Sequence, residues 1–126
     1  MENLLIEIGN TATKATWSDG ITLGKTFRYQ GEKMFEFILS LLENGRPDVL
    51  VLSSTGEIPL KWESVLSGKC GKLALMDLKH KALVSSYGLP DWITPDRAAS
   101  IIASRFLFKG KPVTIFDFGT LITVDF

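Results

Sequence analysis

The amino-acid sequence predicts an α/β domain in which helices flank a mixed central sheet. Strand-turn-strand patterns near both ends of the chain, at 4–17 and 113–126, indicate antiparallel hairpins. The nearly continuous apolar segment 48–53 is instead typical of a parallel strand covered on both faces. Two segments with apolar residues at helical spacing, 32–43 and 94–110, supply helices. A length of 126 residues, with 45% hydrophobic and 22% charged residues, fits one compact domain or a piece of a larger protein.

The first half of the chain is expected to contain four strands and one helix. The expected strands are 4–8, 13–17, 23–29 and 48–53. Gly9-Asn10-Thr11 separates the first two strands as a turn. In the segment 32–43 apolar residues recur at intervals of three and four, which predicts a helix with one buried face. Asn44-Gly45 is expected to cap the carboxyl end of that helix.

The second half has weaker patterns before residue 94 and a clear helix after it. The expected elements before that point are a helix at 60–66, a strand at 73–76 and an irregular stretch at 79–89. Lys79-His80-Lys81 is expected to be an exposed basic loop. Thr94 is a good N-cap with Pro95 at the first helical position, and the helix is expected to continue to Gly110. The last expected strands are 113–117 and 121–126, on either side of a turn.

Composition excludes several classes of protein. Lys plus Arg (14) equals Asp plus Glu (14), so the chain has no net field that would favour direct nucleic-acid binding or an anionic membrane. The single Cys70 and single His80 cannot supply a disulfide or a structural zinc site. The sequence has neither a signal-peptide pattern nor an apolar run of the ~20 residues that span a bilayer. A cytoplasmic location is therefore expected.

The two hairpins share one sequence pattern. Residues 6–11 and 116–120 both read apolar, acidic, apolar, Gly and then Thr, with one extra residue before Thr in the first copy. A carboxylate at the end of a strand, followed by Gly and a hydroxyl residue, lets backbone N–H groups and hydroxyls approach phosphate oxygens while the acid faces a hydrated metal ion. Lys14, on the strand that leaves the first turn, can carry positive charge toward the same anion. The pattern favours two turns that clamp a triphosphate.

Three short motifs occur in order along the chain. They are Glu7-Ile8-Gly9-Asn10-Thr11 with Lys14, then Asp96-Arg97 at the start of a helix, then Asp117-Phe118-Gly119-Thr120 with Thr123 and Asp125. Together they resemble the motifs of the type III pantothenate kinases, a family that also includes Bvg accessory factor type transcriptional activators. The resemblance implies an actin-like ATPase, ribonuclease-H-like fold, with residues 1–126 as an N-terminal domain that ends at the start of a second domain.

The same resemblance implies an activity and its partners. The implied reaction is ATP-dependent phosphorylation of pantothenate to 4'-phosphopantothenate, the first step of coenzyme A biosynthesis, in a homodimer. The implied cofactors are ATP, Mg2+ and a monovalent cation, K+ or NH4+.

Roles for individual residues also follow from the resemblance. The implied ATP-binding residues are Glu7, Ile8, Gly9, Asn10, Thr11, Ala12, Thr13, Lys14 and Thr120. The implied pantothenate-binding residues are Tyr87, Thr94, Pro95, Asp96 and Arg97. Asp96 would be the catalytic proton acceptor, and Asp117 would hold the monovalent cation.

The sequence departs from the family pattern at three positions. Glu7 stands where the family has Asp, Thr94 where it has Gly, and Leu121 where it prefers a small residue. Two alternative functions stay open. One is a non-enzymatic regulatory or transcription-accessory relative, and the other is an actin-like kinase that acts on a different hydroxyl substrate.

Overall fold

The computed structural model describes residues 2–118 and 122–125, with the backbone alone at 117–118 and 122–123. Its strands are β1 (Asn3–Ile8), β2 (Thr13–Asp19), β3 (Thr22–Tyr29), β4 (Val49–Ser54), β5 (Lys72–Met76), β6 (Ile115–Phe118) and β7 (Ile122–Asp125). Its helices are α1 (Met34–Leu42), α2 (Leu60–Ser67), α3 (Ala82–Ser86) and α4 (Pro95–Leu107). In these residues no helix is long and apolar enough to cross a bilayer.

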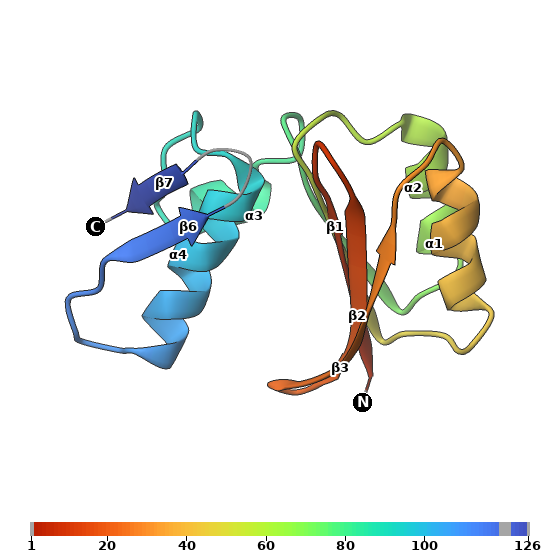
Figure 1. Ribbon diagram of the computed structural model, residues 1–126, viewed down its shortest axis with the longest axis horizontal. Coiled ribbons are helices and arrows are strands. Elements are labelled where there is room, and N and C mark those ends of the chain that lie inside the picture. The colour runs from red at the N-terminus through yellow and green to blue at the C-terminus, as the bar shows by residue number, and fades with distance from the viewer. Residues whose placement is uncertain (1, 119–121, 126) are drawn as a thin grey trace.

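A five-stranded mixed sheet in the order β3-β2-β1-β4-β5 forms the centre of the molecule. The strands β3, β2 and β1 are joined antiparallel, whereas β4 lies parallel to both β1 and β5. The helices α1 and α2 cover one face of this sheet, and α3, α4 and the β6–β7 hairpin lie on the side of the other face (Figure 1). This arrangement confirms the predicted α/β class with a mixed sheet and flanking helices.

The core lies between the sheet and the helices α1 and α2. Alternate residues of β1 point into it, and Leu4, Ile6 and Ile8 are buried while Glu7 is exposed. Ile38 of α1 and Leu66 of α2 pack against them. A second apolar cluster joins β5 to α3 and α4 through Met76, Val84, Ile93 and Ala98. The two clusters lie on opposite faces of the sheet, so the carboxyl ends of the parallel strands are held between two packed layers.

The helix α3 corrects the irregular stretch expected at 79–89. It has five residues, and Val84 is its buried residue. The helix ends in a Schellman motif, in which Gly88 N–H donates to the Ser85 carbonyl (2.9 Å) and Leu89 N–H to the Val84 carbonyl (3.3 Å). Gly88 has a φ of +72°, which favours glycine. One turn of helix is too short to give an apolar periodicity. The sequence could therefore indicate only the end of this helix, through Gly88.

Several expected helix ends are also corrected. The helix α1 ends at Leu42, and its C-cap is Glu43 rather than Asn44-Gly45. The helix α4 ends at Leu107 rather than at Gly110, whose φ of +73° lies in the following turn. Thr94 holds the expected N-cap position, but its side chain makes no capping hydrogen bond.

The hairpin β6–β7 forms a two-stranded sheet of its own. Its strands are antiparallel, with Ile115 opposite Asp125 and Phe116 opposite Val124. The hairpin lies beside α4, away from the edge of the five-stranded sheet (Figure 1). The expected strands 113–117 and 121–126 are thus present with shifted ends.

Candidate functional site

A tight turn joins β1 to β2, and the hairpin that these elements form contains most of the residues predicted to bind ATP. Ile8 and Thr13 form the last register pair of the hairpin. Gly9 N–H donates to the Ala12 carbonyl (3.0 Å), which closes the turn. A Cβ at Gly9 would lie 3.3 Å from the same carbonyl oxygen, so glycine suits this close approach. The segment from Glu7 to Lys14 therefore forms one continuous hairpin at the carboxyl end of β1.

Residues that the sequence motifs did not include hold this turn in place. Because β4 is parallel to β1, the loop after β4 lies beside the turn. Thr55 N–H donates to the Ile8 carbonyl (3.2 Å), and the Thr55 hydroxyl donates to Oδ1 of Asn10 (3.3 Å). On the other side, the Gln30 side-chain amide donates to the Thr11 carbonyl (3.4 Å). The polar run Ser53-Ser54-Thr55-Gly56, at the end of a buried parallel strand, was the sequence signal for the first of these contacts.

Glu7 and Lys14 lie side by side on one face of the sheet. Glu7 is opposite Lys14 on β2 and Ser53 on β4, and paired residues of a sheet point to the same side. Their neighbours Ile8 and Thr13 point into the core beneath α1 and α2. Glu7, Lys14 and Ser53 therefore face the side on which α4 lies (Figure 1). The Thr13 hydroxyl is buried and has no hydrogen-bond partner in the described part of the chain.

The first turn of α4 contains Asp96, the predicted catalytic residue. Oδ1 of Asp96 is buried and has no hydrogen-bond partner within residues 2–118 and 122–125. Pro95 is buried and Thr94 is exposed. The arrangement gives a carboxylate oxygen that is shielded from water and open to accept a proton.

Arg97, the next residue of α4, is paired with Asp125 of β7. Nε of Arg97 donates to Oδ2 of Asp125 (3.1 Å), and Nη2 donates to Oδ1. The hydrogen bond raises the pKa of Arg97 and lowers the pKa of Asp125, although partial burial opposes both shifts. The guanidinium also lies 5.9 Å from the ring centre of Trp92. The pair links α4 to the second hairpin, and its two bonds use two of the five N–H donors of the arginine.

The structure does not bring all predicted site residues together. Tyr87 is exposed, and its carbonyl accepts a hydrogen bond from Arg105 (2.8 Å). Arg105 is nine residues after Asp96, which is about 13 Å along a helix axis. Thr120 lies outside the described residues, and of Asp117 only the backbone is described, opposite Thr123. The roles of Asp117 and Thr120 stay predictions.

Asp77, which follows β5, organises the loops near the carboxyl end of the sheet. Its buried carboxylate accepts hydrogen bonds from the backbone N–H groups of Ile58 (2.6 Å), Lys79 (3.0 Å) and His80 (2.7 Å). Nδ1 of the His80 ring lies 2.7 Å from Oδ1 of Asp77. Burial opposes ionisation of Asp77, but these hydrogen bonds outweigh it and lower its pKa. His80 is partly buried, which corrects the expectation of a freely exposed basic loop.

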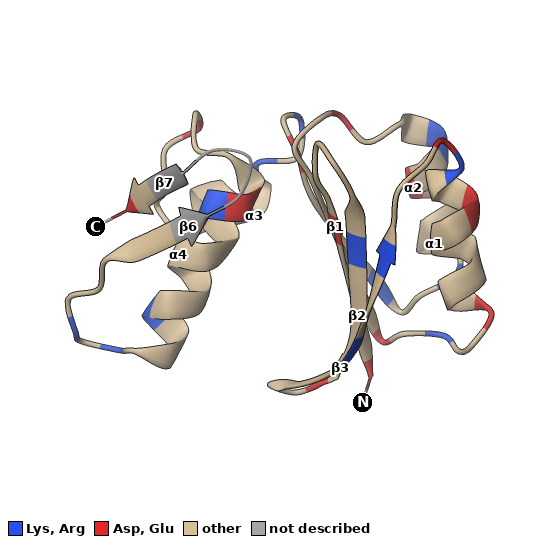
Figure 2. Cartoon of the chain, viewed as in Figure 1, with Lys and Arg blue, Asp and Glu red and all other residues tan. Residues whose placement is uncertain are grey.

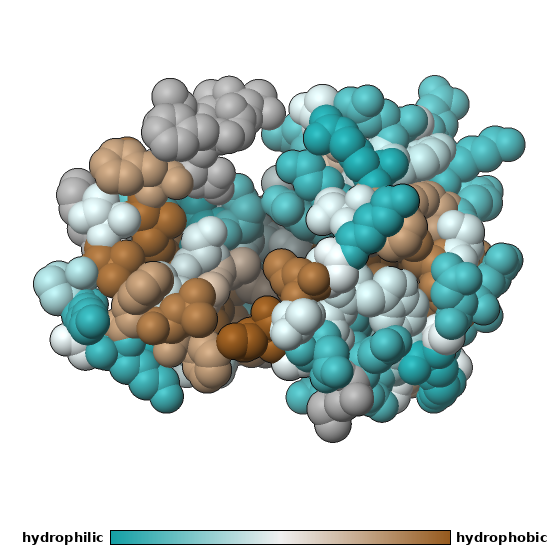
Figure 3. Space-filling view, turned by 60° about the horizontal axis from the view of Figure 1, so that its bottom comes forward, coloured by the Kyte–Doolittle hydropathy of each residue, from teal (hydrophilic) through white to brown (hydrophobic). Residues whose placement is uncertain are grey.

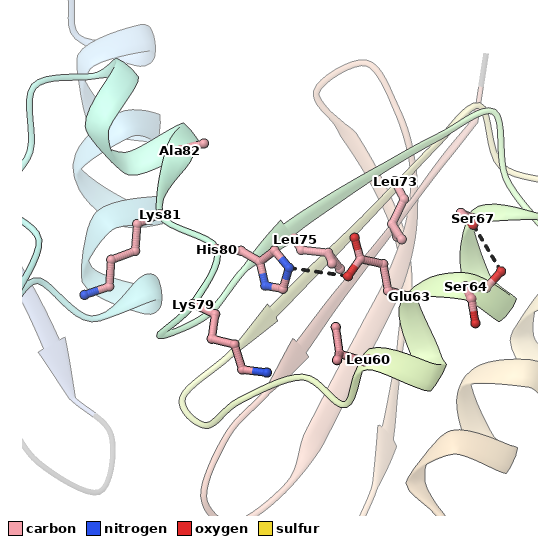
Figure 4. A pocket seen from close by; sticks show the side chains of 10 residues that line it. All are labelled: Leu60, Glu63, Ser64, Ser67, Leu73, Leu75, Lys79, His80, Lys81 and Ala82. Atoms are coloured by element: carbon pink, nitrogen blue, oxygen red, sulfur yellow. Dashed lines mark hydrogen bonds and ion pairs between the residues drawn. The ribbon is translucent and has the colours of Figure 1, made fainter.

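A groove of about 690 Å³ runs between α2, β5 and residues 79–82. Figure 4 shows His80 pointing across it toward Glu63 of α2, at 3.5 Å. Its other cationic groups also have partners, since Lys79 lies 3.6 Å from Glu57 and Lys81 donates to the Asp91 carbonyl (2.7 Å). The charged side chains of this groove thus contact other groups of the same chain. The turn predicted to bind phosphate, between β1 and β2, does not line the groove.

Comparisons with known proteins agree with the motifs. Residues 3–126 match the family model for type III pantothenate kinase. The chain is 30% identical to the type III pantothenate kinases of Azobacteroides pseudotrichonymphae, over 98% of this chain and 50% of that protein, and of Christiangramia forsetii, over 98% and 51%. It is 29% identical to that of Bacteroides fragilis, over 98% of this chain and 51% of the relative. The chain therefore spans about half the length of the curated relatives it matches.

Among solved structures, the chain is similar to a ROK hexokinase from Thermus thermophilus. The TM-score is 0.49 at 16% identity, and the match covers 61% of this chain and 34% of the hexokinase.

Proposed function

The chain belongs to the type III pantothenate kinase family, and on that premise we propose that it forms the N-terminal part of an ATP-dependent pantothenate kinase. The observation that supports this function most strongly is the family match over residues 3–126. Within that match, the turn Gly9–Ala12 and the buried oxygen of Asp96 have the chemistry that the reaction needs. The product is 4'-phosphopantothenate, and the reaction is the first step of coenzyme A biosynthesis.

The hairpin from Glu7 to Lys14 binds the phosphates of ATP in this proposal. Residues of the turn offer backbone N–H groups, and Lys14 adds positive charge beside them. Thr120 contacts ATP from the second hairpin. Phosphoryl transfer needs little covalent chemistry from the protein, so most of the rate comes from positioning and from stabilising charge.

Asp96 is the proposed proton acceptor. The pantothenate hydroxyl oxygen attacks the terminal phosphorus of ATP, the bond from that phosphorus to the bridging oxygen breaks, and the hydroxyl proton passes to Asp96. Arg97 orients the pantothenate carboxylate with the N–H donors that Asp125 does not use. Thr94 and Pro95, next to Asp96, line the same pocket, and Tyr87 is assigned to it from the resemblance to the family, although its backbone lies beside Arg105.

Magnesium enters as part of the Mg2+–ATP substrate. Among the described residues no group of three or more His, Cys, Asp or Glu side chains is placed to hold a metal ion. This fits Mg2+, which usually keeps several waters and needs only one or two carboxylates besides the phosphates of its substrate. Glu7 supplies such a carboxylate next to the turn, and the ion neutralises phosphate charge. The monovalent cation, K+ or NH4+, is assigned to Asp117.

We assign the enzyme to the cytoplasm as a homodimer, without direct nucleic-acid or membrane binding. The equal numbers of acidic and basic residues, 14 each, support the absence of nucleic-acid binding. The second hairpin is proposed to open a second domain.

Ligand binding by the chain tests the function. In 15N-labelled protein, Mg2+–ATP is expected to shift the amide signals of residues 7–14, and pantothenate those of Thr94, Asp96 and Arg97. Glucose serves as a control for a sugar-kinase alternative and is expected to shift neither group. Binding of ATP without pantothenate would favour a kinase with another hydroxyl substrate, and binding of neither would favour a non-enzymatic relative.

A further inference from the structure

A row of polar residues crosses the sheet next to the β1–β2 turn. The registers place Ser53 of β4, Glu7 of β1, Lys14 of β2 and Arg28 of β3 opposite one another in that order. Neighbouring side chains in such a row are about 4.5–5.5 Å apart at Cβ. Lys14 and Arg28 are directly paired, and Figure 2 shows basic residues on the neighbouring strands β2 and β3. The motifs of the sequence include Lys14 but not Arg28.

The row lies on the face of the sheet opposite α1 and α2. Tyr29, the next residue of β3, stacks on Phe37 of α1 with ring centres 5.1 Å apart. Because successive side chains of a strand point to opposite faces, Arg28 points away from α1. Arg28 shares this face of the sheet with Glu7 and Lys14. The helix α4 lies on the same side of the sheet (Figure 1).

Arg28 is also close to the phosphate turn along its own strand. Thr13 and Tyr29 are paired, and Gln30 donates its side-chain amide to the Thr11 carbonyl (3.4 Å). The residue that follows β3 thus contacts the turn directly. Arg28 precedes that contact by two residues.

The Lys14–Arg28 pair has an electrostatic cost that an anion would remove. Like charges directly opposite one another on antiparallel strands destabilise a sheet. Both side chains are exposed, and the ion pairs found in the described part of the chain are formed by other residues. Glu7 flanks Lys14 on the far side from Arg28, so it offsets the repulsion only in part. A phosphate group between Lys14 and Arg28 would turn this repulsion into two charge-assisted hydrogen bonds.

We infer that Arg28 binds a phosphate group of the nucleotide together with Lys14, so that the phosphate site extends from the β1–β2 turn onto β3. The inference rests on the proposed function for the identity of the ligand as ATP. The anion-binding chemistry itself depends only on the two opposed cations and on the neighbouring turn. The guanidinium supplies a forked donor that a lysine at this position would not.

Calorimetric titration of the chain with inorganic tripolyphosphate and with Mg2+–ATP tests the inference. We expect Arg28→Gln to weaken the binding of both ligands about tenfold, the effect of losing one charge-assisted hydrogen bond. Arg28→Lys should recover part of the loss. The matched control is Lys25→Gln, which removes the same charge from the same strand. Lys25 lies on the opposite face, over the ring of Phe27, so we expect less than a twofold change.

The outcomes separate this inference from the proposed function. If the wild-type chain binds both ligands and Arg28→Gln leaves both affinities unchanged, the inference is wrong and the function stands. If tripolyphosphate binds in an Arg28-dependent way and ATP does not bind, the anion site stands and the function is wrong. If the wild-type chain binds neither ligand, both are wrong. A thermal melt that matches the wild type is required of each variant, and the exposure of Arg28 leads us to expect it.

Discussion

Glu7 stands where the resemblance to the family implies Asp. It lies in β1 beside Lys14 and Ser53, and Ile8 alone separates it from the turn. Mg2+ prefers octahedral geometry at about 2.0–2.1 Å, so a carboxylate one methylene longer than Asp must crowd the bound waters or swing aside. We expect Glu7→Asp to raise the affinity for Mg2+–ATP severalfold at saturating magnesium, measured by calorimetry. The control Glu43→Asp, on the exposed C-cap of α1, should change nothing. A loss of affinity would show that Glu7 is already a working ligand.

Asp96 gives a second prediction at the residue scale, because its buried oxygen lacks a partner in the described residues. If Asp96 had a structural role, its buried oxygen would contribute to the stability of the folded chain. A catalytic role requires no such contribution. We expect Asp96→Asn to change the free energy of unfolding by less than about 1 kcal/mol, since the interactions lost are that with the helix dipole and the charge attraction to Arg97. In a full-length enzyme that carries this domain, turnover should fall roughly 100-fold or more. Denaturation of the variant chain checks the first value, and a large destabilisation would make Asp96 a structural helix cap.

At the scale of elements, Asp77 joins the loop after β4 to the loop after β5. Hydrogen bonds to a buried charged group are worth about 1.5–3 kcal/mol, so we expect Asp77→Asn to lower the free energy of unfolding by about 2 kcal/mol at pH 7. The pKa of Asp77 is lower in the folded state than in the unfolded chain. Its contribution is therefore complete above the unfolded pKa of about 4, and it disappears as the pH falls through the lower folded value.

Urea denaturation at pH 7 and pH 3 measures this contribution. The difference between wild type and Asp77→Asn should be smaller at pH 3. The exposed Asp91 provides the control. Asp91→Asn also removes a carboxylate, but one that makes none of the hydrogen bonds of Asp77. Equal differences at both pH values would contradict the assigned role of the Asp77 charge.

The sequence predicted elements well where their pattern was long. The alternation of apolar and polar residues predicted β1 as a strand with one face in the core. The continuous apolar run predicted β4 as a parallel strand covered on both faces. The helix α3 has one turn and therefore no period to detect. The contacts of Asp77, Thr55 and Gln30 were missed for a different reason. The hydrogen bonds from Ile58 to Asp77, from Thr55 to Asn10 and from Gln30 to Thr11 join residues 19 to 45 positions apart, and only the sheet topology brings these residues together.

At the scale of the whole molecule, the exposed apolar side chains are concentrated in the second half of the chain. Phe106, Leu107, Phe108 and Phe116 are each at least 50% exposed. Figure 3 shows apolar surface over the part of the molecule that contains α4 and the second hairpin. Large exposed apolar patches are typical of interaction surfaces, and an isolated two-stranded hairpin has little stability of its own. Both features agree with the proposal that these residues form the N-terminal part of a kinase, and the chain spans about half the length of its curated relatives.

This view of the molecule leads to the last prediction, that residues 1–126 alone show no pantothenate-dependent turnover of ATP. Phosphoryl transfer requires donors fixed around the transferred group and exclusion of water from it. The chain supplies the turn Gly9–Ala12 and the first turn of α4, but half of the length of the curated relatives is absent from it. We therefore expect ATP binding without catalysis. A coupled assay for ADP, with and without pantothenate, measures this directly, and the full-length Bacteroides fragilis relative serves as the positive control. Robust pantothenate-dependent release of ADP by the chain would mean that its own residues form a complete catalytic site.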